Sequence, residues 1–164
     1  YKTLTINNAK IQCALLLCEI LNNCLKEINE SAYIFMVRAF KYLDSVQQVP
    51  VGFDSLFLVK FCQIMGISPL IMDFKNIKNP TLNLQEGVFT EYNSRMSNNP
   101  NFVPTKESLE IYKLSNLELS EIADSILEPK TNTRVFNYLI LYISAHLSDL
   151  SRLKSLKILQ ELVV

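Results

Sequence analysis

Apolar residues recur every three or four positions along the first 65 residues, which is the spacing of one face of an α-helix. Residues 8–29 are predicted to form a long, largely buried helix. Its stripe consists of Ile11, Leu15, Cys18, Leu21, Leu25 and Ile28. A second helix is predicted after Ser31 as N-cap, with Ile34 and Val37 facing inward and Arg38 facing solvent.

Glycine and proline mark the limits of the next helix. Pro50 and Gly52 interrupt the pattern, and Asp54 is expected to cap a helix over residues 55–65. Gly66 stands where a helix commonly ends in a left-handed residue, and Pro69 follows it. The segment 70–104 is rich in asparagine and proline, and it predicts an irregular loop with a small β-hairpin near residues 70–90.

Helical periodicity returns after residue 105. Helices are predicted over residues 106–114, 117–127, about 133–147 and 153–162. The fold class is therefore predicted as all-α, a compact bundle of about six or seven helices around the helix at 133–147, with the hairpin as an excursion. Residues 7–164 are expected to form a single helical domain, with residues 1–6 as the exit from a preceding domain.

The overall composition is ordinary for a globular domain, but the charged residues are unevenly distributed along the chain. The 164 residues are 49% hydrophobic and carry 16 basic and 16 acidic side chains, so the formal net charge is zero. Residues 107–128 are acidic, whereas residues 130–157 are basic. Any role with nucleic acid or an acidic partner must therefore depend on local patches.

The sequence carries no familiar catalytic or metal-binding motif. The single histidine, His146, has no nucleophile or carboxylate beside it in a motif, and the four cysteines do not have the spacing of a metal site. Neither an enzyme, a metal nor a cofactor is predicted. Free thiols favour a reducing, cytoplasmic setting, and the longest apolar run, residues 11–21, is too short to span a membrane.

The basic residues near the C-terminus are the first candidates for a binding site. They are Lys130, Arg134, Arg152, Lys154 and Lys157. Three interpretations remain open: an ordinary solvated face, a surface that contacts phosphates, or the basic rim of an apolar groove that binds an acidic peptide ending in an apolar residue.

Four segments, in order and over about residues 7–164, resemble the C-terminal helical domain of the DNA repair and recombination protein RecO. They are ALLLCEILNNCL (14–25), FLVKFCQIMGISP (57–69), Phe74 with EGVF (86–89), and HLSDLSRLKSLKIL (146–159). Residues 70–89 lack the four cysteines that form a zinc site in many relatives, so the resemblance is to the branch without zinc. The family's N-terminal OB-fold domain has no counterpart in this chain. The third helix opens with Ser55 and Leu56, where some relatives have two arginines.

The resemblance implies a non-enzymatic recombination mediator in a bacterial cytoplasm, associated with the nucleoid during repair. Such proteins bind the acidic, Phe-ended C-terminal tail of single-strand-binding protein, bind RecR, promote RecA loading and anneal DNA. Single- and double-stranded DNA would be bound mainly by the OB-fold domain. The candidate cations are Arg38, Lys60, Arg134, Arg152, Lys154 and Lys157, with Phe57 and Phe61 as candidate groove walls. The alternative is a helical protein-interaction scaffold unrelated to DNA.

Overall fold

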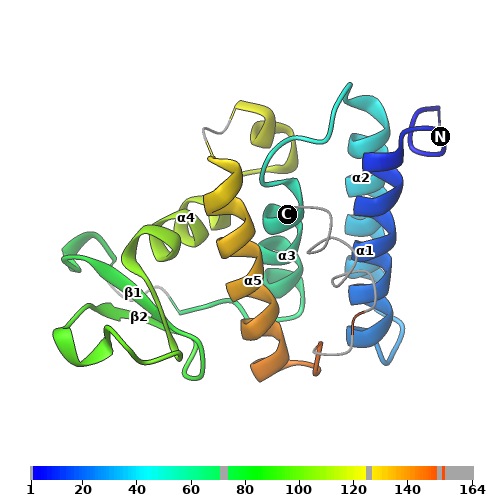
Figure 1. Ribbon diagram of the computed structural model, residues 1–164. Coiled ribbons are helices and arrows are strands. Elements are labelled where there is room, and N and C mark those ends of the chain that lie inside the picture. Colours follow the sequence, from blue (N-terminus) through cyan, green and yellow to red (C-terminus); the bar gives the residue numbers. More distant parts are fainter. Residues whose placement is uncertain (1, 71–73, 125–126, 151–152, 154–164) are drawn as a thin grey trace.

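Asparagine side chains begin the first two helices (Figure 1). The computed structural model describes residues 2–70, 74–124, 127–150 and 153. Helix α1 spans Asn8–Cys24, and the Asn7 side chain accepts a hydrogen bond from the Lys10 N–H. Helix α2 spans Glu30–Ser45, and the Asn29 oxygen accepts one from the Ala32 N–H at 2.9 Å. The predicted N-cap Ser31 is therefore wrong, because α1 ends at Cys24 and leaves Asn29 free to cap.

Two glycines in the left-handed region flank helix α3, Phe53–Ile64. Gly52 occupies the N-cap position with φ 90°, so Asp54 lies inside the first turn and is not the cap that the sequence suggested. At the other end, Gly66 has φ 71°. The Ile67 N–H donates to the Cys62 carbonyl at 3.0 Å, and the Gly66 N–H donates to the Gln63 carbonyl at 3.2 Å. This pair of bonds is a Schellman motif, which confirms the predicted stop.

The predicted hairpin is present and carries a third strand. Strands β1 (Pro80–Asn83) and β2 (Val88–Glu91) are antiparallel, with Leu82 opposite Phe89. Strand β3 (Phe102–Val103) pairs with the other edge of β1, which gives the order β2-β1-β3. Short 3₁₀ turns, η1 (Phe74–Asn76) and η2 (Ser94–Met96), lie in the loops around the sheet. The fold is mostly helical, as predicted, and the hairpin excursion is a small three-stranded antiparallel sheet.

The predicted number of helices is also too high for the part of the chain that is described. Helix α4 spans Thr105–Ser115 and α5 spans Pro129–His146, which makes five α-helices among the described residues. The acidic stretch predicted as a helix over 117–127 forms a 3₁₀ segment, η3 (Leu119–Asp124). The helix predicted over 153–162 lies almost wholly outside the described residues.

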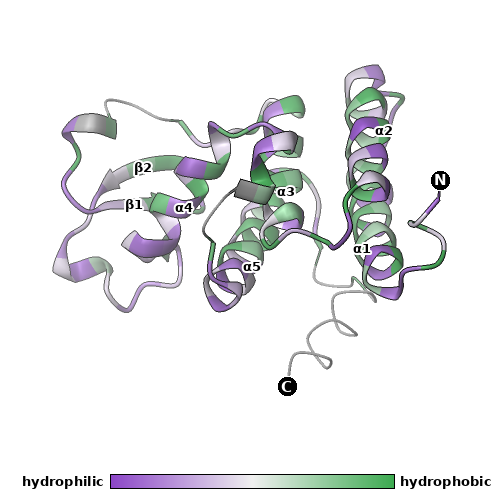
Figure 2. Cartoon of the chain, turned by 90° about the horizontal axis from the view of Figure 1, so that it is seen from above, coloured by the Kyte–Doolittle hydropathy of each residue, from purple (hydrophilic) through white to green (hydrophobic). Residues whose placement is uncertain are grey.

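Helix α3 forms the centre of the molecule. It packs against α2, α4, α5 and η3, and its residues from Leu56 to Val59 are all buried. The predicted central helix, α5, packs on α3 and α4 and leaves Leu141 53% exposed. Figure 2 shows hydrophobic residues concentrated in the helices and hydrophilic residues in the loops around the sheet. No helix in the described ranges is long and apolar enough to cross a membrane.

Buried polar contacts fix the sheet to the helices. The Ser108 hydroxyl on α4 donates to the Val103 carbonyl at 2.9 Å and accepts from the Leu82 N–H at 3.0 Å. On α5, the Tyr142 hydroxyl donates to the Ile67 carbonyl at 2.7 Å, and His146 Nε2 lies 2.8 Å from the Leu84 carbonyl oxygen. The single histidine therefore has a structural contact. These bonds keep the sheet at the end of the bundle away from α1 and α2 (Figure 1).

Candidate functional site

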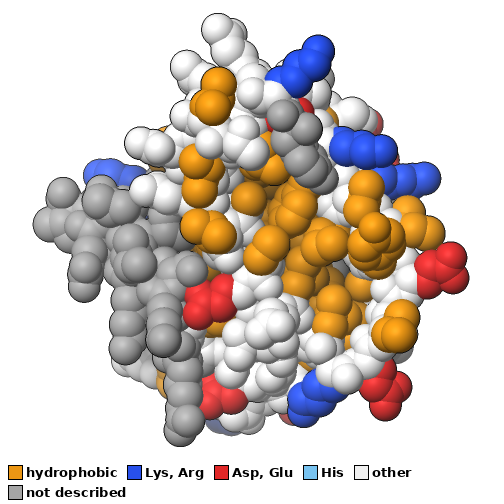
Figure 3. All heavy atoms as spheres, turned by 90° about the vertical axis from the view of Figure 1, so that its right-hand side faces the viewer, with side chains coloured by type: hydrophobic (Ala, Val, Ile, Leu, Met, Phe, Trp, Pro, Cys, Tyr) orange, Lys and Arg blue, Asp and Glu red, His pale blue; other side chains and the backbone are white. Residues whose placement is uncertain are grey.

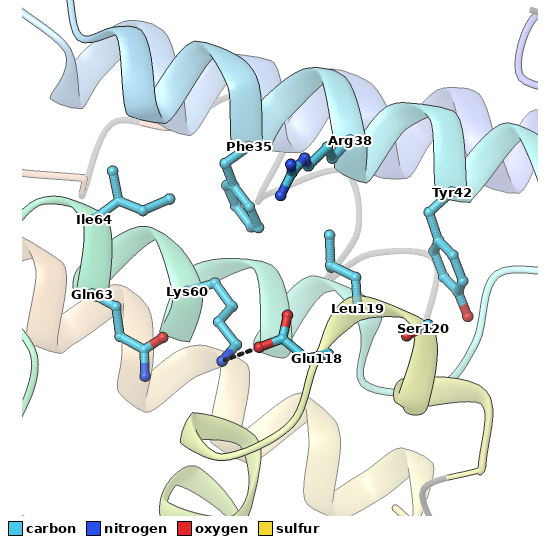
Figure 4. A pocket seen from close by; sticks show the side chains of 9 residues that line it. All are labelled: Phe35, Arg38, Tyr42, Lys60, Gln63, Ile64, Glu118, Leu119 and Ser120. Carbon is cyan, nitrogen blue, oxygen red and sulfur yellow. Dashed lines mark ion pairs between the residues drawn. The ribbon is translucent and has the colours of Figure 1, made fainter.

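Helices α2 and α3 and the start of η3 enclose a pocket of about 480 Å³ (Figure 4). Helix α2 contributes residues at positions i, i+3 and i+7, which share one face of a helix. The lining residues are Phe35, Arg38 and Tyr42 from α2, Lys60, Gln63 and Ile64 from α3, and Glu118, Leu119 and Ser120. The pocket thus joins segments that are far apart in the sequence.

Aromatic contacts hold the α2 side of the pocket in place. The Phe35 ring lies 4.9 Å from the ring of the buried Phe57. The Tyr42 ring stacks on Phe53 with the ring centroids 5.9 Å apart. Phe35 itself is only half-buried, so one side of its ring packs on the core while the rest borders the pocket. Phe35 and Ile64 give the pocket an apolar interior. The ring contacts keep the aromatic side chains of α2 at the edge of the pocket.

Lys60 is held at the pocket by the end of α4. Its Nζ donates to the Ser115 carbonyl at 3.2 Å and lies 3.9 Å from Glu118 Oε1. Gln63 Nε2 donates to the same carbonyl at 2.9 Å. The last carbonyls of a helix carry partial negative charge and favour a cation there. Because the Lys60 side chain is only 14% exposed, its ammonium is fixed in position at the pocket.

Arg38 is the exposed cation of the pocket. Its side chain points toward the pocket from α2 (Figure 4). Within the described ranges its guanidinium makes no hydrogen bond or ion pair. A free guanidinium can bind a carboxylate through two parallel hydrogen bonds. Two cations against the single carboxylate of Glu118 leave the pocket with a net positive charge.

These features suit the binding of an acidic segment that ends in an apolar side chain. The apolar interior can take a large side chain, and the cations can pair with carboxylates next to it. The exposed Glu118, whose side chain is 79% accessible, pairs with Lys60 at only 3.9 Å. A surface ion pair of this length is weak, so an incoming carboxylate can replace Glu118.

The predicted groove walls Phe57 and Phe61 are wrong. Both side chains are 0% exposed in the centre of α3. Because α3 is surrounded by α2, α4, α5 and η3, its aromatic residues fill the core. The apolar lining comes from Phe35, Ile64 and Leu119, which the sequence analysis missed. A signal was present, since Phe35 lies three residues before the predicted cation Arg38 and so shares its face.

Of the six predicted cations, three lie among the described residues, and two of these, Arg38 and Lys60, line the same pocket. Arg134 does not line this pocket; its Nε lies 2.9 Å from Oε1 of Glu107, a buried carboxylate on α4. Arg134 thus joins α5 to α4. Arg152, Lys154 and Lys157 lie outside the described residues.

The described thiols are poorly suited to nucleophilic chemistry. Burial raises the pKa of Cys62 to about 12 and that of Cys24 to about 11, so both are protonated at neutral pH. Cys18, predicted in the buried stripe of the first helix, is exposed, and partial burial raises its pKa as well. Among the described residues, no group of three or more His, Cys, Asp or Glu side chains could hold a metal ion.

The fold and the pocket define a class of protein: a small helical domain with a short antiparallel sheet, whose candidate site is suited to binding a segment of another protein. Sequence comparison shows which known proteins the chain resembles. Three curated DNA repair proteins RecO are similar to this chain over most of its length. The protein of Christiangramia forsetii is 24% identical over 164 residues, which is 99% of this chain and 65% of that protein.

The other two relatives give the same result. RecO of Flavobacterium psychrophilum is 26% identical, and the match covers 87% of this chain and 57% of that protein. RecO of Azobacteroides pseudotrichonymphae is 21% identical, and the match covers 93% of this chain and 62% of that protein. No family model and no solved structure matches. The chain is therefore similar to RecO proteins over most of its length, and it spans about three fifths of the length of the curated relatives it matches.

Proposed function

We propose that this chain is a non-enzymatic module of a RecO-like recombination mediator in DNA repair, and that the pocket of Arg38 and Lys60 docks the acidic, Phe-ended tail of single-strand-binding protein. The names of the relatives support the repair role. The observation that carries the docking site is the meeting of two predicted cations, from α2 and α3, over an apolar interior that includes Phe35.

The tail would bind through its two kinds of group. Its terminal Phe side chain fills the apolar space beside Phe35 and Ile64. Its carboxylates pair with the free guanidinium of Arg38 and with the fixed ammonium of Lys60. Binding of RecR, binding of single- or double-stranded DNA and promotion of RecA loading belong to the same proposal. The pocket described here explains only the binding of the tail.

The test is a titration of a labelled acidic, Phe-ended peptide into the chain, at low and at physiological salt. Arg38→Ala is expected to weaken binding about tenfold, equivalent to about 1.4 kcal/mol, because a charge-assisted pair is lost. Lys60→Ala is expected to act in the same direction. Arg95→Ala is the matched control, since Arg95 is an exposed arginine that does not line the pocket.

Specificity is checked with a peptide that lacks the terminal Phe, which should bind more weakly to the wild-type chain than the complete peptide does. The proposal fails if the folded chain does not bind the complete peptide saturably, or if Arg38→Ala and Lys60→Ala bind as tightly as Arg95→Ala. Either result would overturn the assignment of the tail to this pocket and would leave docking of RecR or a purely structural role as the better account of this domain.

A further inference from the structure

Helices α1 and α2 leave apolar side chains exposed to solvent. Tyr33 is 62% exposed and Ile34 is 45% exposed on α2, and Leu15 is 59% exposed on α1. The prediction that Ile34 faces inward is therefore wrong. Figure 3 shows hydrophobic side chains gathered on one face of the molecule, with charged side chains of both signs along its margin. A continuous exposed apolar patch of this kind usually marks an interaction surface.

The charges on α2 are arranged with opposite signs on either side of Ile34. Glu30 lies four residues before Ile34, and Arg38 lies four residues after it. Both side chains are exposed, and neither forms an ion pair with any residue that the structure describes. Eight residues of helix separate them by about 12 Å along the axis, so they cannot pair with each other within one chain.

Residues four apart form a ridge on the surface of a helix. When two helices pack in the commonest way, the ridges of this type on each helix lie parallel, one in the groove of the other. The ridge Glu30, Ile34, Arg38 is bordered by a second one, Tyr33, Val37, Lys41. The groove between the two ridges is therefore bordered by apolar side chains, Ile34 and Val37, near its middle.

We propose that this face of α2 binds the same face of a second copy of the chain, in an antiparallel arrangement with the two-fold axis beside Ile34. The two-fold axis places Ile34 against its counterpart, and it brings each Glu30 next to Arg38 of the other copy. A two-fold interface needs a surface that is complementary to itself, and opposite charges at equal distances from an apolar centre meet that need. This inference does not depend on the proposed function, although both use Arg38.

The test is the concentration dependence of the molecular mass of the chain, measured by sedimentation equilibrium. Ile34→Glu is expected to weaken the dimer at least tenfold, because it places two like charges at the axis. Leu141→Glu is the matched control, since Leu141 is 53% exposed on α5, away from this face. Both positions are exposed, so each variant should keep the thermal stability of the wild type.

Charge reversal tests the arrangement itself. Glu30→Arg alone and Arg38→Glu alone should each weaken the dimer, and the double variant should restore it, because the pair is re-formed with its signs exchanged. The proposal is overturned if the wild-type chain stays monomeric at all concentrations, if Ile34→Glu dimerises as Leu141→Glu does, or if the double variant is weaker than both single ones. Ile34→Glu and Glu30→Arg do not alter the pocket, so peptide binding by these variants separates this result from the proposed function.

Discussion

At the residue scale, one carboxylate holds the start of the described chain. Asp44, near the end of α2, accepts hydrogen bonds from the backbone N–H groups of Leu4 at 2.7 Å, Lys2 at 2.8 Å and Thr3 at 2.7 Å. These bonds, that of Leu4 first, lower the pKa of the Asp44 carboxyl. The buried Lys10 completes the contact, since its Nζ donates to the Thr3 hydroxyl and the Val46 carbonyl.

Asp44→Asn is expected to lower the free energy of unfolding at neutral pH, because an amide offers one acceptor oxygen where the carboxylate has two charged ones. The pKa of Asp44 is lowered by folding, so its carboxylate stabilises the fold fully above the pKa of an unfolded aspartate, about 3.9. That contribution is lost as the pH falls below this value. Urea unfolding at neutral pH and at about pH 3 should therefore show a difference from wild type that shrinks in acid.

Glu86→Gln serves as the control for Asp44→Asn, because Glu86 is an exposed carboxylate whose side chain has no hydrogen bond or ion pair within the described residues. It should unfold like the wild type at both pH values. An equal midpoint for Asp44→Asn and the wild type at neutral pH would contradict the stabilising role of this contact.

At the scale of elements, the two glycines that flank α3 provide a matched pair. Both have positive φ, but a Cβ on Gly66 would meet no atom within 4 Å, whereas one on Gly52 would lie 2.8 Å from Leu127 Cδ2 and 3.3 Å from Ile122 Cδ1. Gly66→Ala should cost about 1 kcal/mol of backbone strain alone. Gly52→Ala should cost about 2 kcal/mol or more, because Leu127 must also move. Equal losses in a denaturant titration would show that packing at Gly52 is unimportant.

Features that depend on a few neighbouring residues could be predicted from the sequence, whereas features that depend on tertiary packing could not. The end of α3 at Gly66 was predictable because the glycine and the helix pattern before it suffice. The start of the same helix was not, because Asp54 is a good cap by residue type, and only the packing of Ile122 and Leu127 against Gly52 shows that the chain turns earlier. The stretch at 117–127 also has a helical pattern, but its residues Leu119–Asp124 form the 3₁₀ segment η3.

The same limit applies to the candidate site. Arg38 and Lys60 could be chosen from the sequence as cations near apolar positions, but the side on which each apolar neighbour lies depends on the packing of α2 against α3. Periodicity predicts Ile34 in the core, and the family resemblance makes Phe57 a candidate groove wall. In the structure Ile34 is 45% exposed and Phe57 is 0% exposed, because the core side of α2 is taken by small residues such as Ala32 and Ala39.

At the scale of the whole molecule, the two proposed interactions meet at Arg38. The side chain lines the pocket, and it also belongs to the ridge centred on Ile34. One guanidinium cannot pair fully with a tail carboxylate and with Glu30 of a second copy at the same time. The two binding events should therefore oppose each other, and thermodynamic linkage requires the effect to be equal in both directions.

A saturating acidic, Phe-ended peptide is expected to shift the chain toward monomer, by about fivefold or more in the dimer dissociation constant. Sedimentation at fixed protein concentration with increasing peptide measures this shift. A peptide with its carboxylates changed to amides is the control, and Lys60→Ala should need more peptide for the same effect because Lys60 lies in the pocket and not on the ridge. If the peptide saturates the chain while the dimer stays unchanged, Arg38 does not serve both surfaces. The tail would then reach the pocket through Lys60 alone, and the two surfaces would act independently.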